Sequence, residues 1–360
     1  GLLRNKPVDR IGLYDTPWDD TLKKWTVEGG YPKNDQDKPV SPVDFFNFDM
    51  AGCGGWFDCL PLPGQEEVLE ETDEWILKRN GAGAALKTWK HKSGAPGHVD
   101  FLMTNRQVWE KDYRPHLLEV NPERLDIEFT QKELARRREQ GCWTFYSHMF
   151  IWEIMRSSMG DICMYESLAL DPGWVHDFNR VYTDFFKAHY KILIEEAGKP
   201  DGIWMYEDLG YNKGLFCSPQ TLKDLIFPYY REMVDFFHGY DLPVILHACG
   251  GITDALPLII EAGFDGLNPM EAKAGCDVVD LAQKYGDQIA FIGGFDGLIF
   301  ESGDREKISR EVRRILNGIK ASKARYVFGS DHSISTNVKL ADFQYALEVY
   351  RENMFYRKKT

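Results

Sequence analysis

The chain has 360 residues, of which 43% are hydrophobic, and a formal net charge of −13. This length and composition suffice to bury a full core, and α/β barrels commonly reach this size as one domain. The negative charge argues against a nucleic acid or an anionic membrane as a partner, because either would require a basic surface.

The first part of the chain gives few clear elements. Residues 10–14 are expected to form a first strand, whereas glycine, proline and charged residues interrupt every apolar run between 16 and 138. The aromatic run 143–152 is typical of a buried strand and also of a pocket for a flat ligand. Asp171 and Pro172 predict the start of a long helix that ends near Gly198.

From about residue 200 onward, short apolar runs alternate with amphipathic stretches, which indicates repeated βα units and a parallel sheet. The predicted strands are 202–206, 243–246, 264–267, 289–292 and 325–328, and the predicted helices are 218–238, 252–261, 277–285, 304–319 and 340–353. Five βα units account for this half. We therefore predict an α/β fold, a (β/α)8 TIM barrel formed by a single domain over residues 1–360, with N-terminal insertions that contain the remaining strands.

Polar residues directly after the predicted strands are the candidates for chemistry, since the active site of such a barrel lies at the C-terminal ends of its strands. His247 and Cys249 are two residues apart on an extended segment, so both side chains can project toward one ion. An imidazole together with a thiolate favours zinc. The same spacing also fits a buried strand end with a satisfied histidine and an inert thiol.

Further roles follow from the same rule. His332 is the expected third metal ligand, because it too follows a predicted strand. Glu207 is an alternative ligand or a general acid, and Asp208 is a second candidate acid. The residues expected to bind substrate are His148, Phe150, Asn268, Glu271 and Asp331. The seven scattered cysteines do not suggest a disulfide framework, so we expect reduced thiols that are free to bind metal.

Several motifs together resemble the uroporphyrinogen decarboxylase superfamily over most of the chain. These motifs are residues 6–10, 206–210, 218–219, 247–251, 263–269, 285–287, 293–294 and 330–334. Within the superfamily, His247 and Cys249 resemble the first two zinc ligands of the corrinoid-dependent methyltransferase branch. The third ligand of that branch, a cysteine near the last strand, has no counterpart here, and Ser330 or His332 stands in that region. The arginine-rich segment with which true decarboxylases grip a porphyrinogen is also absent.

The resemblance implies a methyltransferase that binds a small methylated donor, such as an aromatic methyl ether, and passes the methyl group to the Co(I) corrinoid of a partner protein. Zinc would act as a Lewis acid on the ether oxygen, and Glu207 or Asp208 would protonate the departing phenolate. One alternative is a metal-dependent decarboxylase or lyase for a small carboxylate, which would need a cationic anchor. Another is a non-enzymatic ligand-binding barrel, which would tolerate the loss of His247 and Cys249.

The cellular location is predicted from two features of the sequence. No apolar run approaches 18 residues, and the first residues lack the charged-then-apolar order of a signal peptide. We therefore expect a cytoplasmic protein with no membrane partner.

Overall fold

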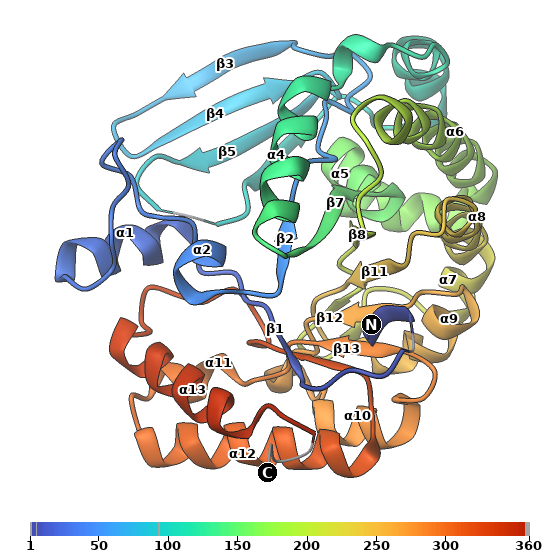
Figure 1. Cartoon of the computed structure of the whole chain (residues 1–360). Coiled ribbons are helices and arrows are strands. Elements are labelled where there is room, and N and C mark those ends of the chain that lie inside the picture. Colours follow the sequence, from blue (N-terminus) through green and yellow to red (C-terminus); the bar gives the residue numbers. More distant parts are fainter. Residues whose placement is uncertain (1, 5, 93, 357–360) are drawn as a thin grey trace.

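Eight parallel strands form a nearly closed barrel in the computed structural model, which describes every residue except 1, 5, 93 and 357–360 (Figure 1). Their order around the sheet is β1 (Gly12–Leu13), β14 (Tyr326–Phe328), β13 (Ala290–Ile292), β12 (Gly266–Asn268), β11 (Val244–His247), β8 (Gly202–Tyr206), β7 (Trp143–Met149) and β2 (Met50–Gly52). Asp49 closes the gap between β2 and β1. Its N–H donates to the Leu13 carbonyl at 2.8 Å, and its Oδ2 accepts from the Leu13 N–H at 2.8 Å. The predicted (β/α)8 barrel is confirmed.

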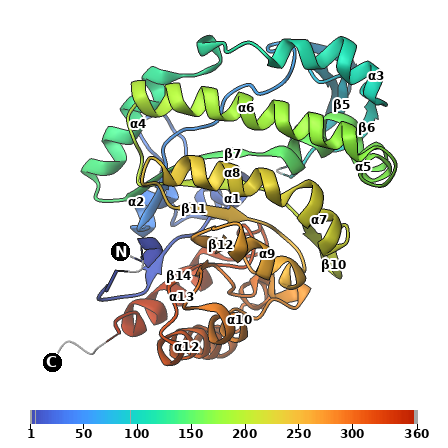
Figure 2. The ribbon, with the colours of Figure 1, turned by 90° about the vertical axis from the view of Figure 1, so that its right-hand side faces the viewer.

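Helices surround the barrel, and Figure 2 shows α6 and α8 side by side on its outer surface. The helices that follow barrel strands are α1 (Asp19–Glu28), α2 (Pro42–Phe46), α5 (Ile151–Leu170), α6 (Pro172–Glu196), α7 (Pro219–Leu225), α8 (Phe227–His238), α9 (Leu256–Glu261), α10 (Val278–Tyr285), α11 (Gly297–Glu301), α12 (Arg305–Ser322) and α13 (Leu340–Asn353). Over the part of the chain that the structure describes, none of the helices is long and apolar enough to cross a bilayer.

The sequence-based prediction of the second half agrees closely with the structure. β8 spans the five predicted residues, and the strands after it deviate by one or two residues. The helix predicted over 218–238 is instead two helices, α7 and α8, which meet at Ile226. Pro228 lies in the first turn of α8, where its ring disfavours continuation of the preceding helix. Ser218 caps α7, and its Oγ accepts from the Thr221 N–H at 3.0 Å.

The unassigned stretch 16–138 supplies β2 and a four-stranded antiparallel sheet, seen at the upper left of Figure 1. Its strands are β3 (Glu66–Glu71), β4 (Trp75–Asn80), β5 (Ala84–Trp89) and β6 (Gly97–Phe101), in that order. The sheet packs on α5 where Phe101 contacts Gly160. A Cβ on Gly160, whose φ is +76°, would lie 2.5 Å from the Phe101 ring, so this position requires glycine.

The remaining elements are short. They are η1 (Leu2–Arg4), α3 (Arg106–Val108), η2 (Trp109–Tyr113), η3 (Arg114–Leu117), η4 (Pro122–Arg124), η5 (Thr253–Ala255), η6 (Ala272–Ala274) and the hairpin β9 (Gly210–Tyr211) and β10 (Gly214–Leu215). Helix α4 (Ile127–Glu139) leads into β7. These elements connect the barrel units and the inserted sheet.

A separate hydrophobic cluster fills the inside of the barrel. It consists of Leu3, Met50, Phe145, Trp204, Ile245, Ala290, Ile292 and Val327. Phe145 and Trp204 stack at its centre, with their ring centroids 5.0 Å apart. Leu3 closes the cluster at the N-terminal ends of the strands, where it lies against Gly266. A cavity of ≈ 230 Å³ remains at this end, lined by residues that include Leu3 and Trp143. The active site of such a barrel, however, lies at the C-terminal ends of the strands.

Candidate active site and metal centre

A cavity of ≈ 500 Å³ opens at the C-terminal ends of the barrel strands. Its aromatic lining comes from Tyr14, Trp18, Trp204 and Tyr206. Its polar lining includes Asp15, Asp208, His247, Cys249, Asn268 and His332. Among the described residues that line it, none is a lysine or an arginine. The cavity therefore combines aromatic surface with potential metal ligands and offers no positive side chain to an anion.

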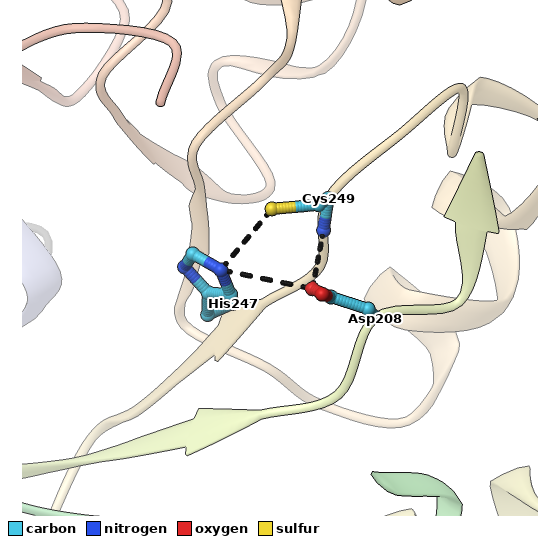
Figure 3. A group of neighbouring side chains, drawn as sticks. All are labelled: Asp208, His247 and Cys249. Carbon is cyan, nitrogen blue, oxygen red and sulfur yellow. Dashed lines mark hydrogen bonds and ion pairs between the residues drawn. The ribbon is translucent and has the colours of Figure 1, made fainter. Parts of the chain in front are cut away.

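Two overlapping groups of side chains in this cavity could hold a metal ion. Asp208, His247 and Cys249 place one ligand atom each within 4.8 Å of one another, and Cys249, Glu271 and His332 do the same. His247 Nε2 lies 3.3 Å from Cys249 Sγ and 3.7 Å from Asp208 Oδ1. Figure 3 shows these three side chains pointing toward one another from the ends of β8 and β11. The three expected metal ligands thus all line the cavity, but His247 and His332 belong to different groups, which share Cys249.

The turn after Cys249 is held by close backbone packing. Gly250 has a φ of +87°, and a Cβ on it would lie 2.3 Å from the backbone of Gly210. Only glycine avoids this overlap. The Cys249 N–H donates to Asp208 Oδ1 at 2.9 Å, so the same packing also fixes the carboxylate next to the thiol.

The orientation of the His247 ring is set by Asn268. The amide nitrogen of Asn268 donates to the Ile292 carbonyl at 2.9 Å, so its oxygen faces His247 Nδ1, at 2.5 Å. Nδ1 must therefore carry the proton, and Nε2 presents its lone pair to Cys249 and Asp208. Burial lowers the pKa of His247, which favours the neutral imidazole that a metal requires.

The electrostatics around Cys249 also favour a cation. Burial and then the charge of Asp208 raise the pKa of this thiol well above its ordinary value. The thiol therefore keeps its proton unless a positive charge lies beside it. A thiol between the two carboxylates Asp208 and Glu271 is an environment that a divalent cation would stabilise.

The profile of the uroporphyrinogen decarboxylase (URO-D) family matches residues 155–353, more than half of the chain. The chain belongs to this family. The solved structure of a methyltransferase from Methanosarcina mazei aligns with 98% of this URO-D family member and 96% of its own chain, with a TM-score of 0.69 and 14% identity, which shows a shared fold. A Xaa-Pro dipeptidase with bound methionine aligns over 64% and 65% of the two chains at 13% identity, and its TM-score of 0.26 is too low to indicate a common fold. No curated protein matches the sequence.

In this URO-D protein, Glu207 lies outside the described cavity lining, unlike its neighbour Asp208. Its buried carboxylate accepts the N–H groups of Phe150 at 2.7 Å and Trp152 at 2.8 Å, and also the Tyr230 hydroxyl. Burial raises the pKa of Glu207 to about 8. The two acids directly follow β8, and of the two only Asp208, like Tyr206 at the end of the strand, lines the cavity. Glu207 anchors the start of α5, and Asp208 is the acid at the cavity.

Three residues expected to bind substrate are placed elsewhere. Both ring nitrogens of His148 face backbone carbonyl oxygens: Nδ1 lies 2.8 Å from the Met149 oxygen, and Nε2 lies 3.0 Å from the Phe57 oxygen. Phe150 is buried in the core. Asp331 accepts the backbone N–H groups of Ala272 and Gly297 and so joins the loops after β12 and β13. Their positions do not support substrate contact. Asn268 does line the cavity but bonds to His247, and Glu271 belongs to the second metal-binding group.

Asp15 and Trp18 line the cavity and were missed by the sequence-based prediction. Asp15 directly follows the predicted strand 10–14, so the strand-end rule would have found it. Its Oδ1 accepts from the Ser330 hydroxyl at 2.6 Å and the Thr16 N–H at 2.8 Å, and its Oδ2 accepts from the Ser330 N–H at 3.0 Å. Burial raises the pKa of Asp15 to about 6. The carboxylate thus ties the end of β1 to the end of β14.

Proposed function

We propose that this URO-D family member is a methyltransferase that takes the methyl group of an aromatic methyl ether and passes it to the Co(I) corrinoid of a partner protein. The proposal rests on the convergence of a neutral imidazole, a thiol and two carboxylates on a cavity whose described lining has no lysine or arginine. The fold shared with the Methanosarcina methyltransferase supports it. We further propose that the protein is cytoplasmic and that residues 1–360 act as one domain.

His247, Cys249 and His332 are the proposed zinc ligands, with Glu271 as a further donor. Imidazole nitrogen and thiolate sulfur are ligands that zinc prefers, and the lone pair of His247 Nε2 is directed at Cys249 Sγ. When bound, zinc supplies Lewis acidity toward an ether oxygen.

Asp208 is the proposed source of the proton for the departing oxygen. As the methyl group leaves, the C–O bond breaks and its electron pair stays on the phenolate oxygen; the electron pair that receives the methyl group would come from the corrinoid of the partner protein. Asp208 would pass a proton from solvent in the open cavity to the phenolate, so that the carboxylate is regenerated at the end of the step. The carboxylate is suited to this role because it lines the cavity, is 39% exposed, and is held by the Cys249 N–H.

A decarboxylase or lyase for a small carboxylate fits the site less well. Such an enzyme needs a positive group to hold the anion. Lys273 lies beside the metal-binding group, but its Nζ is 3.8 Å from Glu271 Oε1, so a carboxylate already accompanies it.

The test has two parts. Elemental analysis of protein purified without chelators should find about one zinc per chain. The purified protein should then convert a Co(I) corrinoid protein to its methylated form when aryl methyl ethers are supplied, and this change is visible in the corrinoid absorbance. Absence of transition metal after zinc addition, or turnover of carboxylates without methyl transfer, would reject the proposal.

A further inference from the structure

Trp18 stands at the start of α1, where its side chain cannot serve as a helix cap. It is the N-cap of α1, with φ −60° and ψ 150°, and its side chain makes no capping hydrogen bond. N-cap positions favour serine, threonine, aspartate or asparagine, whose oxygen accepts a free N–H of the first turn. An indole cannot do so. A residue that is unfavourable for its position in the secondary structure, and that lies at a cavity, is a candidate for a role in binding.

The backbone holds Trp18 firmly beside the metal-binding group. Its N–H donates to the Ile334 carbonyl at 3.1 Å, and Pro17 forms a parallel bridge with Ile334. The segment after β1 therefore pairs with the segment after β14, which carries His332. As a result the Trp18 and His332 rings lie with centroids 6.3 Å apart, inclined at 46°.

The Trp18 ring remains 37% exposed while it lines the cavity. An exposed indole next to a group of metal ligands offers a flat apolar surface to any ligand whose reacting atom faces those ligands. An aryl ring would bury this surface by stacking.

We propose that Trp18 forms an aryl-binding subsite, on which the planar ring of the substrate stacks while its methyl ether faces His332 and Cys249. This inference rests on the proposed function for the orientation of the ether. The subsite itself requires only that aryl ligands bind and that the indole contacts them.

Trp56 provides a matched control. It is also an exposed tryptophan, at 51%, and it follows the neighbouring strand β2. Its ring stacks on His148 with centroids 4.8 Å apart, and it is not among the described residues that line the cavity. Its ring also lies 5.8 Å from that of Tyr206, which lines the cavity, so loss of Trp56 removes a comparable exposed ring from behind the lining while Trp18 stays in place.

The experiment measures calorimetric binding of anisole and of cyclohexyl methyl ether to the full chain, without any corrinoid protein. Wild type should prefer anisole, and Trp18→Ala should bind anisole about two- to tenfold more weakly. Binding of the cyclohexyl ether should change little. Trp18→Phe, which keeps an aromatic ring, should retain most of the preference, and Trp56→Ala should behave like wild type.

Trp18→Ser separates binding from the stability of α1. Serine can cap the helix, so this variant should be more stable than Trp18→Ala and yet lose anisole binding to the same extent. Recovery of binding in Trp18→Ser would show that helix stability, and not the ring, is responsible. Equal weakening of both ethers, no binding of either ether to wild type, or the same loss in Trp56→Ala would also overturn the subsite.

The outcomes also separate the subsite from the proposed function. If anisole binding depends on Trp18 but no methyl ether serves as a donor, the subsite stands and the methyltransferase proposal fails. If methyl transfer occurs and Trp18→Ala still uses aryl ethers as well as wild type does, the function stands and the subsite fails.

Discussion

His247 donates its Nδ1 proton to the side-chain oxygen of Asn268, which lies 2.5 Å away. Asn268→Ala removes this acceptor, so the imidazole becomes free to rotate and to shift its proton to Nε2, where a metal must bind. We expect zinc affinity to fall by about 10- to 100-fold. Competition with a chromophoric chelator at fixed pH measures this change without any methyl transfer.

Asn179→Ala is the control for that prediction. Asn179 is a fully buried asparagine of α6, outside the described cavity lining, and its amide donates to the Leu225 carbonyl at 2.9 Å. Its loss should lower stability and leave zinc affinity unchanged. If Asn268→Ala binds zinc as tightly as wild type does, Asn268 does not act through His247.

Cys249→Ala should remove zinc and abolish methyl transfer while the thermal midpoint changes little, because the barrel core does not depend on the metal. Cys53→Ala should give the opposite result. Cys53 is fully buried after β2, with Sγ 3.3 Å from the Phe145 carbonyl oxygen, so its truncation should cost about 1 kcal/mol and leave zinc in place. Zinc content, thermal midpoint and single-turnover rate would be measured together. If Cys249→Ala turns over at the wild-type rate, this thiol has a structural role only and does not take part in catalysis.

The second half of the barrel was predictable because each βα unit contains its own signals. Ser218 and Pro219 start α7, and Asp304 caps α12 through hydrogen bonds to two backbone N–H groups. The strands of the first half lack such signals. β1 and β2 span only two and three residues, too few to establish a periodicity, and β3 is exposed at every position, so it shows no alternation of buried and exposed residues.

The candidate site was predictable only as far as strand ends can be located. His247 and Cys249 could be predicted to lie at the C-terminal end of β11, because the end of this strand was located to within one residue. Glu207 and Asp208 are consecutive, and which of two neighbours faces inward depends on a register that the sequence does not determine. Trp18 carries no sequence signal at all, because its role arises only when the segments after β1 and β14 pair in space.

Glu207→Gln and Asp208→Asn should have opposite effects. The first places an amide N–H₂ where the carboxylate accepts backbone N–H groups from the start of α5, so we expect a loss of about 1–3 kcal/mol in stability and little change in rate. The second should slow methyl transfer by about 10²- to 10⁴-fold and leave stability nearly unchanged. Urea denaturation and single-turnover kinetics measure the two effects. The reverse pattern would identify Glu207 as the acid.

The carboxyl group of Asp15 should make stability depend on pH. Burial raises its pKa from 3.8 to about 6, although three hydrogen bonds oppose this shift. Between these values the folded state binds more protons than the unfolded state does, so the contribution of this group to stability is fully present below about pH 4 and is lost as the pH rises through about 6. Asp15→Asn cannot titrate. The stability of wild type relative to Asp15→Asn should therefore fall by on the order of 3 kcal/mol between about pH 4 and pH 7. Urea unfolding of both proteins across this pH range provides the measurement. If the difference in unfolding free energy between wild type and Asp15→Asn stays constant or grows with pH, the hydrogen bonds from Ser330 and Thr16 outweigh burial and keep Asp15 ionised.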